Sequence, residues 1–154
     1  MKIKTGIFVG TFDPFTIGHS NIVSRALPLF DKLVIGVVGD NVHKPGITPA
    51  KERVAAIEAL YRKEPRIEVK PYFGLAVDFA LSEQACFLVK GVRSVKDFEY
   101  EREQADINRQ ISGGQVDTLL LFCEPSLGSV SSSMVRELQH FGLDISQFLP
   151  QQPE

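Results

Sequence analysis

The segment from Gly10 to His19 combines residue types that bind phosphate with a place in the chain where a strand passes into a helix. It contains two glycines, two threonine hydroxyls and one histidine, and it follows the short apolar run 7–9. A junction of this kind offers free backbone N–H groups and the positive end of a helix dipole to an anion. The histidine adds a donor for charge that develops during a reaction. The segment therefore predicts a nucleotide-handling enzyme.

Three later segments carry chemistry of the same kind. Two cations flank a glycine in Lys90–Arg93, a spacing that lets both reach one polyphosphate. Small hydroxyl residues in Gly128–Ser133 precede a helix-like segment, where N–H and O–H groups can hold phosphate together. His43 and Lys44 offer a donor and a flexible cation. Surface cations and a serine N-cap are the ordinary alternatives, so only the convergence of these segments with Gly10–His19 favours a site.

The elements that must position these residues alternate, strand then helix, five times. Continuously apolar strands indicate a parallel sheet covered on both faces, with right-handed crossovers. We expect an α/β fold, a Rossmann-like doubly wound five-stranded parallel sheet in a single domain over 1–150, with a disordered tail at 151–154. A flavodoxin-like strand order gives the same linear pattern and stays open. The expected strands are 5–9, 33–38, 67–70, 86–90 and 117–123, and the expected helices are 18–31, 48–64, 75–84, 95–112 and 131–141.

Local signals make more detailed predictions. Pro28 lies inside the first helix and predicts a kink or an early end there. Thr48 and Pro49 are typical of an N-cap and a first helical residue. Asp13 before Pro14 indicates a structural role in a turn. The helix expected at 95–112 is mostly charged, so it is either solvated or faces a site or a subunit.

Composition narrows the classes of function. The chain has 154 residues and a formal net charge of −2, which disfavours nucleic acid or an anionic membrane as a partner. The apolar run 33–38 is far shorter than a membrane span, and we expect a soluble, cytoplasmic protein. Cys86 and Cys123 lie in apolar stretches of the sequence, and we expect both to be buried, reduced and inert. The carboxylates between Asp97 and Glu103 alternate along a helix and scatter around it, so no metal site is expected from protein side chains.

With these residues in view, the chain resembles the bacterial phosphopantetheine adenylyltransferases, a family of the nucleotidyltransferase superfamily that carries a T/H-x-G-H motif. That motif is Thr16–His19 in this sequence. The motif alone identifies the superfamily, and its combination with Asp97–Glu101 at this chain length is more specific. Similar blocks cover nearly the whole chain: Gly10–Pro14, Gly91–Arg93, Asn108–Arg109, Ser131–Ser133 and Phe148–Pro150.

The resemblance implies transfer of adenylate from ATP to 4′-phosphopantetheine, which gives dephospho-coenzyme A and pyrophosphate, with Mg²⁺ on the ATP phosphates and a homohexameric assembly. The acceptor phosphate is already anionic, so orientation and charge stabilisation matter more than base catalysis. By the resemblance, His19 stabilises the developing charge and Thr11 contacts the phosphates between the two substrates. Lys44 and Arg93 complete the expected catalytic set.

The resemblance also assigns each substrate its contacts. The residues expected to bind ATP are Thr11, Phe12, His19, Gly91, Val92, Arg93, Glu101, Leu127, Gly128, Ser129, Val130, Ser131, Ser132 and Ser133. The residues expected to bind phosphopantetheine are Thr11, His43, Lys44, Gly74, Leu75, Ala76 and Lys90.

Three positions depart from the family pattern. His43 stands where the family has a lysine, and we expect Lys44, one residue later, to reach the acceptor phosphate instead. Lys90 replaces an arginine, which loses the bidentate fork and keeps the charge. Leu127 stands where the family often has tryptophan. A transferase that uses CTP, a nicotinamide mononucleotide adenylyltransferase and a non-catalytic nucleotide-binding module are the alternatives.

Overall fold

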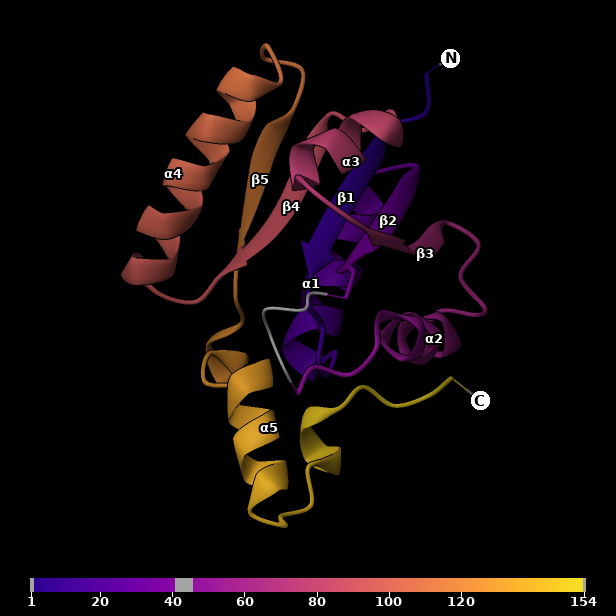
Figure 1. Cartoon of the computed structure of the whole chain (residues 1–154), viewed down its shortest axis with the longest axis vertical. Helices are drawn as coiled ribbons and strands as arrows, with labels where there is room; N and C mark the ends of the chain where they lie inside the picture. Colours follow the sequence, from indigo (N-terminus) through magenta and orange to yellow (C-terminus); the bar gives the residue numbers. More distant parts are fainter. Residues whose placement is uncertain (1, 41–45, 154) are drawn as a thin grey trace.

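The computed structural model describes residues 2–40 and 46–153 and has a five-stranded parallel sheet at its centre (Figure 1). The strand order is β3-β2-β1-β4-β5, which is the Rossmann order and not the flavodoxin-like one. The predicted fold class is therefore confirmed, and the open question of strand order is settled. The strands are β1 (Thr5–Gly10), β2 (Lys32–Val38), β3 (Ile67–Tyr72), β4 (Phe87–Val92) and β5 (Asp117–Phe122).

Helices cover the sheet on both faces. One core holds side chains of α1 (Ile17–Ala26) and α2 (Ala50–Leu60), and the other holds side chains of α3 (Ala76–Ser82). The long helix α4 (Val95–Ile111) packs along β4 and β5. Figure 1 shows α5 (Ser132–His140) and the C-terminal segment beyond the carboxyl ends of the strands. Short 3-10 helices lie at Leu27–Leu29, Pro125–Leu127 and Ser146–Phe148.

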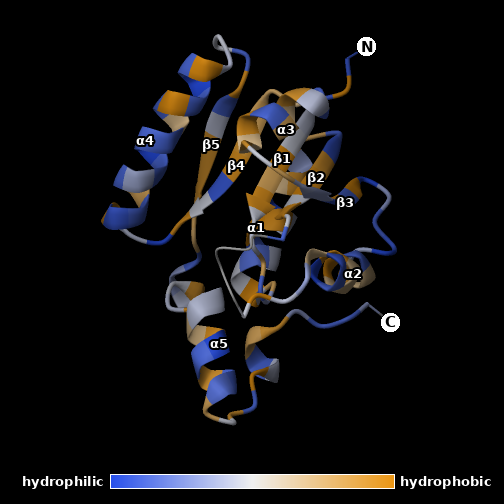
Figure 2. Ribbon diagram, in the orientation of Figure 1, coloured by the Kyte–Doolittle hydropathy of each residue, from blue (hydrophilic) through white to orange (hydrophobic). Residues whose placement is uncertain are grey.

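The apolar sequence of β2 shows why the strands have hydrophobic residues at consecutive positions. Leu33, Ile35 and Val37 enter the core on the side of α1 and α2, whereas Val34 enters the core beneath α3. Alternate side chains of a strand point to opposite faces, so a strand that is covered on both faces must be apolar at every position. Figure 2 shows the apolar colour concentrated on the central strands.

The ends of two helices test the local predictions. Helix α1 ends at Ala26 and continues as the 3-10 helix that contains Pro28, so the predicted early end is confirmed. The predicted capping of α2 by Thr48 is wrong, because the helix begins at Ala50 with Pro49 in the N-cap position. The backbone N–H of Ala50 instead donates to Oδ1 of Asp40 at 2.7 Å. The cap therefore comes from the loop after β2, ten residues earlier in the chain.

The two cysteines and α4 are less buried than core residues. The predicted burial of Cys86 is wrong: it is exposed, because it precedes the first residue of β4 and lies outside the covered part of the strand. Cys123 is partly exposed, because it follows the last residue of the edge strand β5. Helix α4, which the structure describes throughout, has no buried residue. Within residues 2–40 and 46–153, no helix has the length and apolar character needed to cross a membrane.

Candidate active site

A cavity of about 350 Å³ lies at the carboxyl ends of β1 and β4. These neighbouring strands are the place where the connections leave to opposite faces of the sheet, which is where open α/β sheets bind ligands. The cavity brings together residues from the loop after β1, the loop after β4 and the start of α5. The predicted site residues that line it are Phe12, His19, Lys90, Gly91, Arg93, Glu101, Val130, Ser131, Ser132 and Ser133.

His19 is fixed by the N-terminus of α1. Thr16 is the N-cap residue, and its side chain accepts a hydrogen bond from the backbone N–H of His19. In return, the backbone N–H of Thr16 donates to Nδ1 of His19 at 2.9 Å, which completes a capping box. Because Nδ1 accepts this bond, the neutral ring carries its proton on Nε2. The T-x-G-H motif thus sets the tautomer of its own histidine.

The surroundings of His19 keep its ring neutral. The ring packs among Phe8, Phe12 and Phe15, with ring centroids 6.3, 5.0 and 5.3 Å away. Burial, and after it the positive charge of Arg93, lowers the pKa of His19 from 6.5 to about 4. Near neutral pH the side chain is therefore an uncharged donor and not a cation.

Two cations of the cavity are held by carboxylates of α4. The guanidinium of Arg93 contacts Oδ2 of Asp97 through Nε at 3.4 Å, and its Nη1 donates to the carbonyl of Val130 at 3.4 Å. The ammonium of Lys90 lies 3.5 Å from Oε2 of Glu101. Both cations line the same cavity, and the action of Lys90–Arg93 on one polyphosphate stays a prediction. Helix α4 faces the site at Asp97 and Glu101, one of the two roles left open for it.

The three serines at the start of α5 have different partners. Ser131 is the N-cap residue, and its side chain accepts from the backbone N–H of Met134. The hydroxyl of Ser132 donates to the carbonyl of Pro14 at 2.7 Å, and Oγ of Ser133 accepts from Arg136. The first backbone N–H groups of a helix have no intrahelical acceptor, so this end of α5 offers donors to an anion in the cavity.

Comparison with known sequences identifies the family of the chain. A family model described as cytidylyltransferase-like matches residues 7–138. A phosphopantetheine adenylyltransferase of Phocaeicola vulgatus is 50% identical over 149 residues, which covers 97% of each chain. The chain belongs to the phosphopantetheine adenylyltransferase family. Family members of the same name from Porphyromonas gingivalis and Levilactobacillus brevis are 47% and 44% identical and cover 98% and 94% of this chain, and 97% and 88% of their own.

Solved structures show that the fold of this phosphopantetheine adenylyltransferase family member is shared more widely. A bifunctional NMN adenylyltransferase/ADP ribose pyrophosphatase from Francisella tularensis superposes with a TM-score of 0.69 at 14% identity. The match covers 96% of this chain but only 45% of the Francisella chain. A lipopolysaccharide core biosynthesis protein from Thermoplasma volcanium gives a TM-score of 0.57 at 18% identity, over 80% of this chain and 98% of its own. At these identities, the two similarities show a shared fold and nothing more.

Some residues that the family resemblance assigned to ATP lie outside the cavity lining. Thr11 stands between Gly10 and Phe12, which both line the cavity, but it is not itself part of the lining. Val92, at the end of β4, is buried. Leu127 ends a 3-10 helix that precedes the lining residue Val130, and Gly128 and Ser129 lie between them.

Of the residues assigned to phosphopantetheine, Lys90 lines the cavity and Thr11 stands beside it, whereas Gly74, Leu75 and Ala76 fall on a different part of the sheet edge. Gly74 has a positive φ of 82°, Leu75 is the N-cap residue of α3 and Ala76 is its first residue. They follow β3, two strands away from β1. A Cβ at Gly39 would overlap the ring of Phe73, so the loops after β2 and β3 touch each other. His43 and Lys44 lie outside the described residues.

Several residues of this family member line the cavity without having been predicted to bind substrate, and two of them lie outside β1, α1 and the loop that joins them. They are Asp97, which orients Arg93, and Cys123, which follows β5. Cys123 is the last residue of the strand expected at 117–123, and this place was the available signal, because carboxyl ends of parallel strands meet at one edge. Asp97 follows Arg93 by four residues and thus had the spacing of a helical ion pair.

Proposed function

We propose that the chain transfers adenylate from ATP to 4′-phosphopantetheine and forms dephospho-coenzyme A and pyrophosphate. The observation that carries the proposal is the neutral Nε2–H donor of His19 in the same cavity as Lys90 and Arg93. Relatives that match 97% of the chain at 50% identity carry the name of this activity. The cavity and the family therefore support the same reaction.

The reaction requires little chemistry from the protein beyond orientation and charge stabilisation. An oxygen of the acceptor phosphate attacks the α-phosphorus of ATP, and the bond to the β-phosphate oxygen breaks with its electron pair leaving on pyrophosphate. No proton has to be removed, because the attacking phosphate is already anionic. Charge grows on the oxygens around the α-phosphorus, where a fixed N–H donor and a guanidinium stabilise it. In this scheme Nε2–H of His19 and the guanidinium of Arg93 supply those donors.

Mg²⁺ enters this proposal as part of the MgATP substrate. Within the described part of the chain, no group of three or more His, Cys, Asp or Glu side chains is arranged to hold a metal ion. The two carboxylates of the cavity, Asp97 and Glu101, already pair with Arg93 and Lys90. Mg²⁺ favours phosphate oxygens as ligands, so we propose that the ion is held by the phosphates of ATP and not by these two carboxylates.

The test of the proposal is an assay for dephospho-coenzyme A with MgATP and 4′-phosphopantetheine, in which His19 is varied in two ways. His19→Asn keeps an acceptor at the δ position for the N–H of Thr16 and removes the donor at the ε position. We expect wild-type protein to form product and His19→Asn to lose about 10²- to 10³-fold in kcat, the cost of one transition-state donor. Wild-type protein that is folded yet forms no product would refute the proposal.

The same assay separates the other nucleotidyltransferase activities. CTP in place of ATP, and nicotinamide mononucleotide in place of phosphopantetheine, are run in parallel with pyrophosphate release as the readout. We expect turnover with ATP and phosphopantetheine to exceed both. Equal or faster release with either replacement would assign a different substrate.

The assembly and location of the chain complete the proposal. We propose that it acts in the cytoplasm as a homohexamer. Exposed apolar side chains on α4, namely Val95, Ile107 and Ile111, support burial against other copies. Light scattering should give six times the chain mass of 17.1 kDa, and a monomer mass would contradict the assembly.

A further inference from the structure

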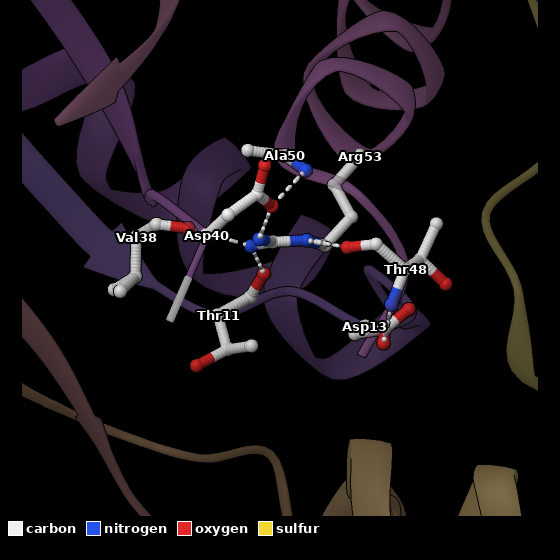
Figure 3. A network of polar contacts seen from close by, with 7 residues as sticks. All are labelled: Thr11, Asp13, Val38, Asp40, Thr48, Ala50 and Arg53. Atoms are coloured by element: carbon white, nitrogen blue, oxygen red, sulfur yellow. Dashed lines mark hydrogen bonds and ion pairs between the residues drawn. The ribbon is translucent and has the colours of Figure 1, made fainter. Parts of the chain in front are cut away.

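Arg53 is a buried charge that ties three segments together (Figure 3). Its side chain is only 2% exposed. Nε donates to the carbonyl of Thr48 at 2.7 Å, and Nη1 donates to the carbonyls of Thr11 and Val38, both at 2.8 Å. Nη2 lies 3.5 Å from Oδ1 of Asp40. One side chain of α2 therefore contacts the loops after β1 and β2 and the segment that leads into α2.

The sheet explains why these carbonyls need an outside donor. The last paired position between β1 and β2 joins Gly10 to Val37, so Thr11 and Val38 stand one residue beyond it. A buried carbonyl without a donor costs free energy, and a buried guanidinium needs acceptors. The planar guanidinium offers donors in several fixed directions, which a single ammonium cannot reproduce. Arg53 thus donates hydrogen bonds to the first carbonyls beyond the point where the pairing of β1 with β2 ends.

The bond to Thr11 also fixes the residue that follows it. A trans peptide places its carbonyl and the next N–H on opposite sides, so the N–H of Phe12 points away from Arg53. Phe12 has a φ of 53°, which is uncommon for a residue with a side chain and must be held by its surroundings. Figure 3 shows the hydroxyl of Thr11 directed away from the guanidinium.

We propose that Arg53 is a positioning residue for adenylyl transfer, which fixes the Thr11 carbonyl and so presents the Thr11 hydroxyl and the Phe12 N–H beside the cavity. The inference rests on the proposed function, in which Thr11 contacts the phosphates of both substrates. Arg53 itself does not line the cavity, so it acts through Thr11. Its loss displaces a contact near the reacting phosphates and leaves the ATP contacts of Arg93 and the α5 serines in place.

The experiment compares Arg53→Lys and Arg53→Met with an arginine control. Arg62→Gln is that control, because Arg62 follows α2 and donates to the carbonyls of Ala59 and Pro153 at the surface. We expect kcat to fall about 10- to 100-fold in Arg53→Lys, the effect of a small misplacement near the reacting atoms. We expect the Kd of ATP, measured by calorimetry without acceptor, to stay within about threefold of wild type. If Arg53→Met does not fold, Arg53→Lys decides.

A double variant separates positioning from stability. In a Thr11→Ala background, Arg53→Lys should cost less than about threefold further in kcat, because two residues that act through one contact are not additive. A lower unfolding midpoint with unchanged kcat would overturn the inference, and so would losses that multiply in the double variant. A rise in the ATP Kd that matches the fall in kcat would overturn it too. An inactive wild type and an inactive Arg62→Gln would refute the proposed function instead, and the inference with it.

Discussion

The charge of His19 offers a direct physical test of the site. The folded protein holds the pKa of His19 at about 4, whereas an unfolded chain has it at 6.5. Above pH 6.5 the ring is neutral in both states, so it adds no pH dependence to stability. Between pH 6.5 and 4 the unfolded chain binds a proton that the folded protein does not, and stability falls as the pH falls. Below about pH 4 both states are protonated and the loss is complete.

The size of the effect follows from the shift itself. Each pKa unit is worth about 1.4 kcal/mol, so a fall from 6.5 to about 4 amounts to about 3 kcal/mol. Carboxylates also contribute to acid destabilisation, so the wild-type curve alone does not isolate His19. The difference in unfolding free energy between wild type and His19→Asn does isolate it. That difference should be constant above pH 6.5 and shrink by about 3 kcal/mol by pH 4.

Two measurements check this prediction. Urea unfolding of wild type and His19→Asn at several pH values gives the free energies. Imidazole ¹H–¹⁵N NMR gives the pKa and the tautomer, with the signal assigned through His19→Asn and with His140→Gln as the matched control. We expect Nε2 to carry the proton at neutral pH, because Nδ1 accepts from Thr16. A His19 signal that titrates near 6.5, or a proton on Nδ1, would refute the reasoning.

Three further predictions concern other parts of the molecule. Asp40→Ala should lower the unfolding free energy by about 1 kcal/mol in urea, because it removes the cap on α2, and an unchanged value would contradict that role. MgATP should slow alkylation of Cys123, which lines the cavity, and leave Cys86 unaffected, as peptide mass spectrometry can follow. Lys44→Ala should raise the KM for phosphopantetheine more than His43→Ala does, and the reverse order in steady-state kinetics would transfer the acceptor contact to His43.

The place of the candidate site could be predicted from the sequence, because the topology of a parallel sheet brings the candidate residues to one edge. Once the strands were recognised as parallel, the segments that contain His19, Arg93 and Ser131 had to lie at the same edge of the sheet. The order of the strands could not be predicted, since two orders fit the same alternation. The cap on α2 could not be predicted either, because Asp40 stands ten residues from the N–H it receives and local capping rules consider only neighbours.

The contacts of Arg53 also could not be predicted from the sequence. The buried residues of α2 are Ala50, Arg53, Val54 and Ile57, so an arginine occupies one position of the apolar face. A charge at such a position is rarely left unpaired, and this was the signal that sequence alone offered. Its partners are the carboxylate of Asp40 and three backbone carbonyls, and a carbonyl carries no mark in the sequence. Only the fold shows which carbonyls lie within reach of the guanidinium.

The loop after β1 owes its shape to contacts from both sides. From α2, Arg53 holds the carbonyl of Thr11, and from α5, Arg136 and Ser132 hold the carbonyls of Asp13 and Pro14. The backbone N–H of Thr48 adds a bond to Oδ2 of Asp13, which confirms the structural role predicted for that residue. Groups held in this way need little rearrangement when charge develops beside them, and electrostatic stabilisation gains most from such fixed donors. The loop and His19 are therefore set by the fold before a substrate arrives.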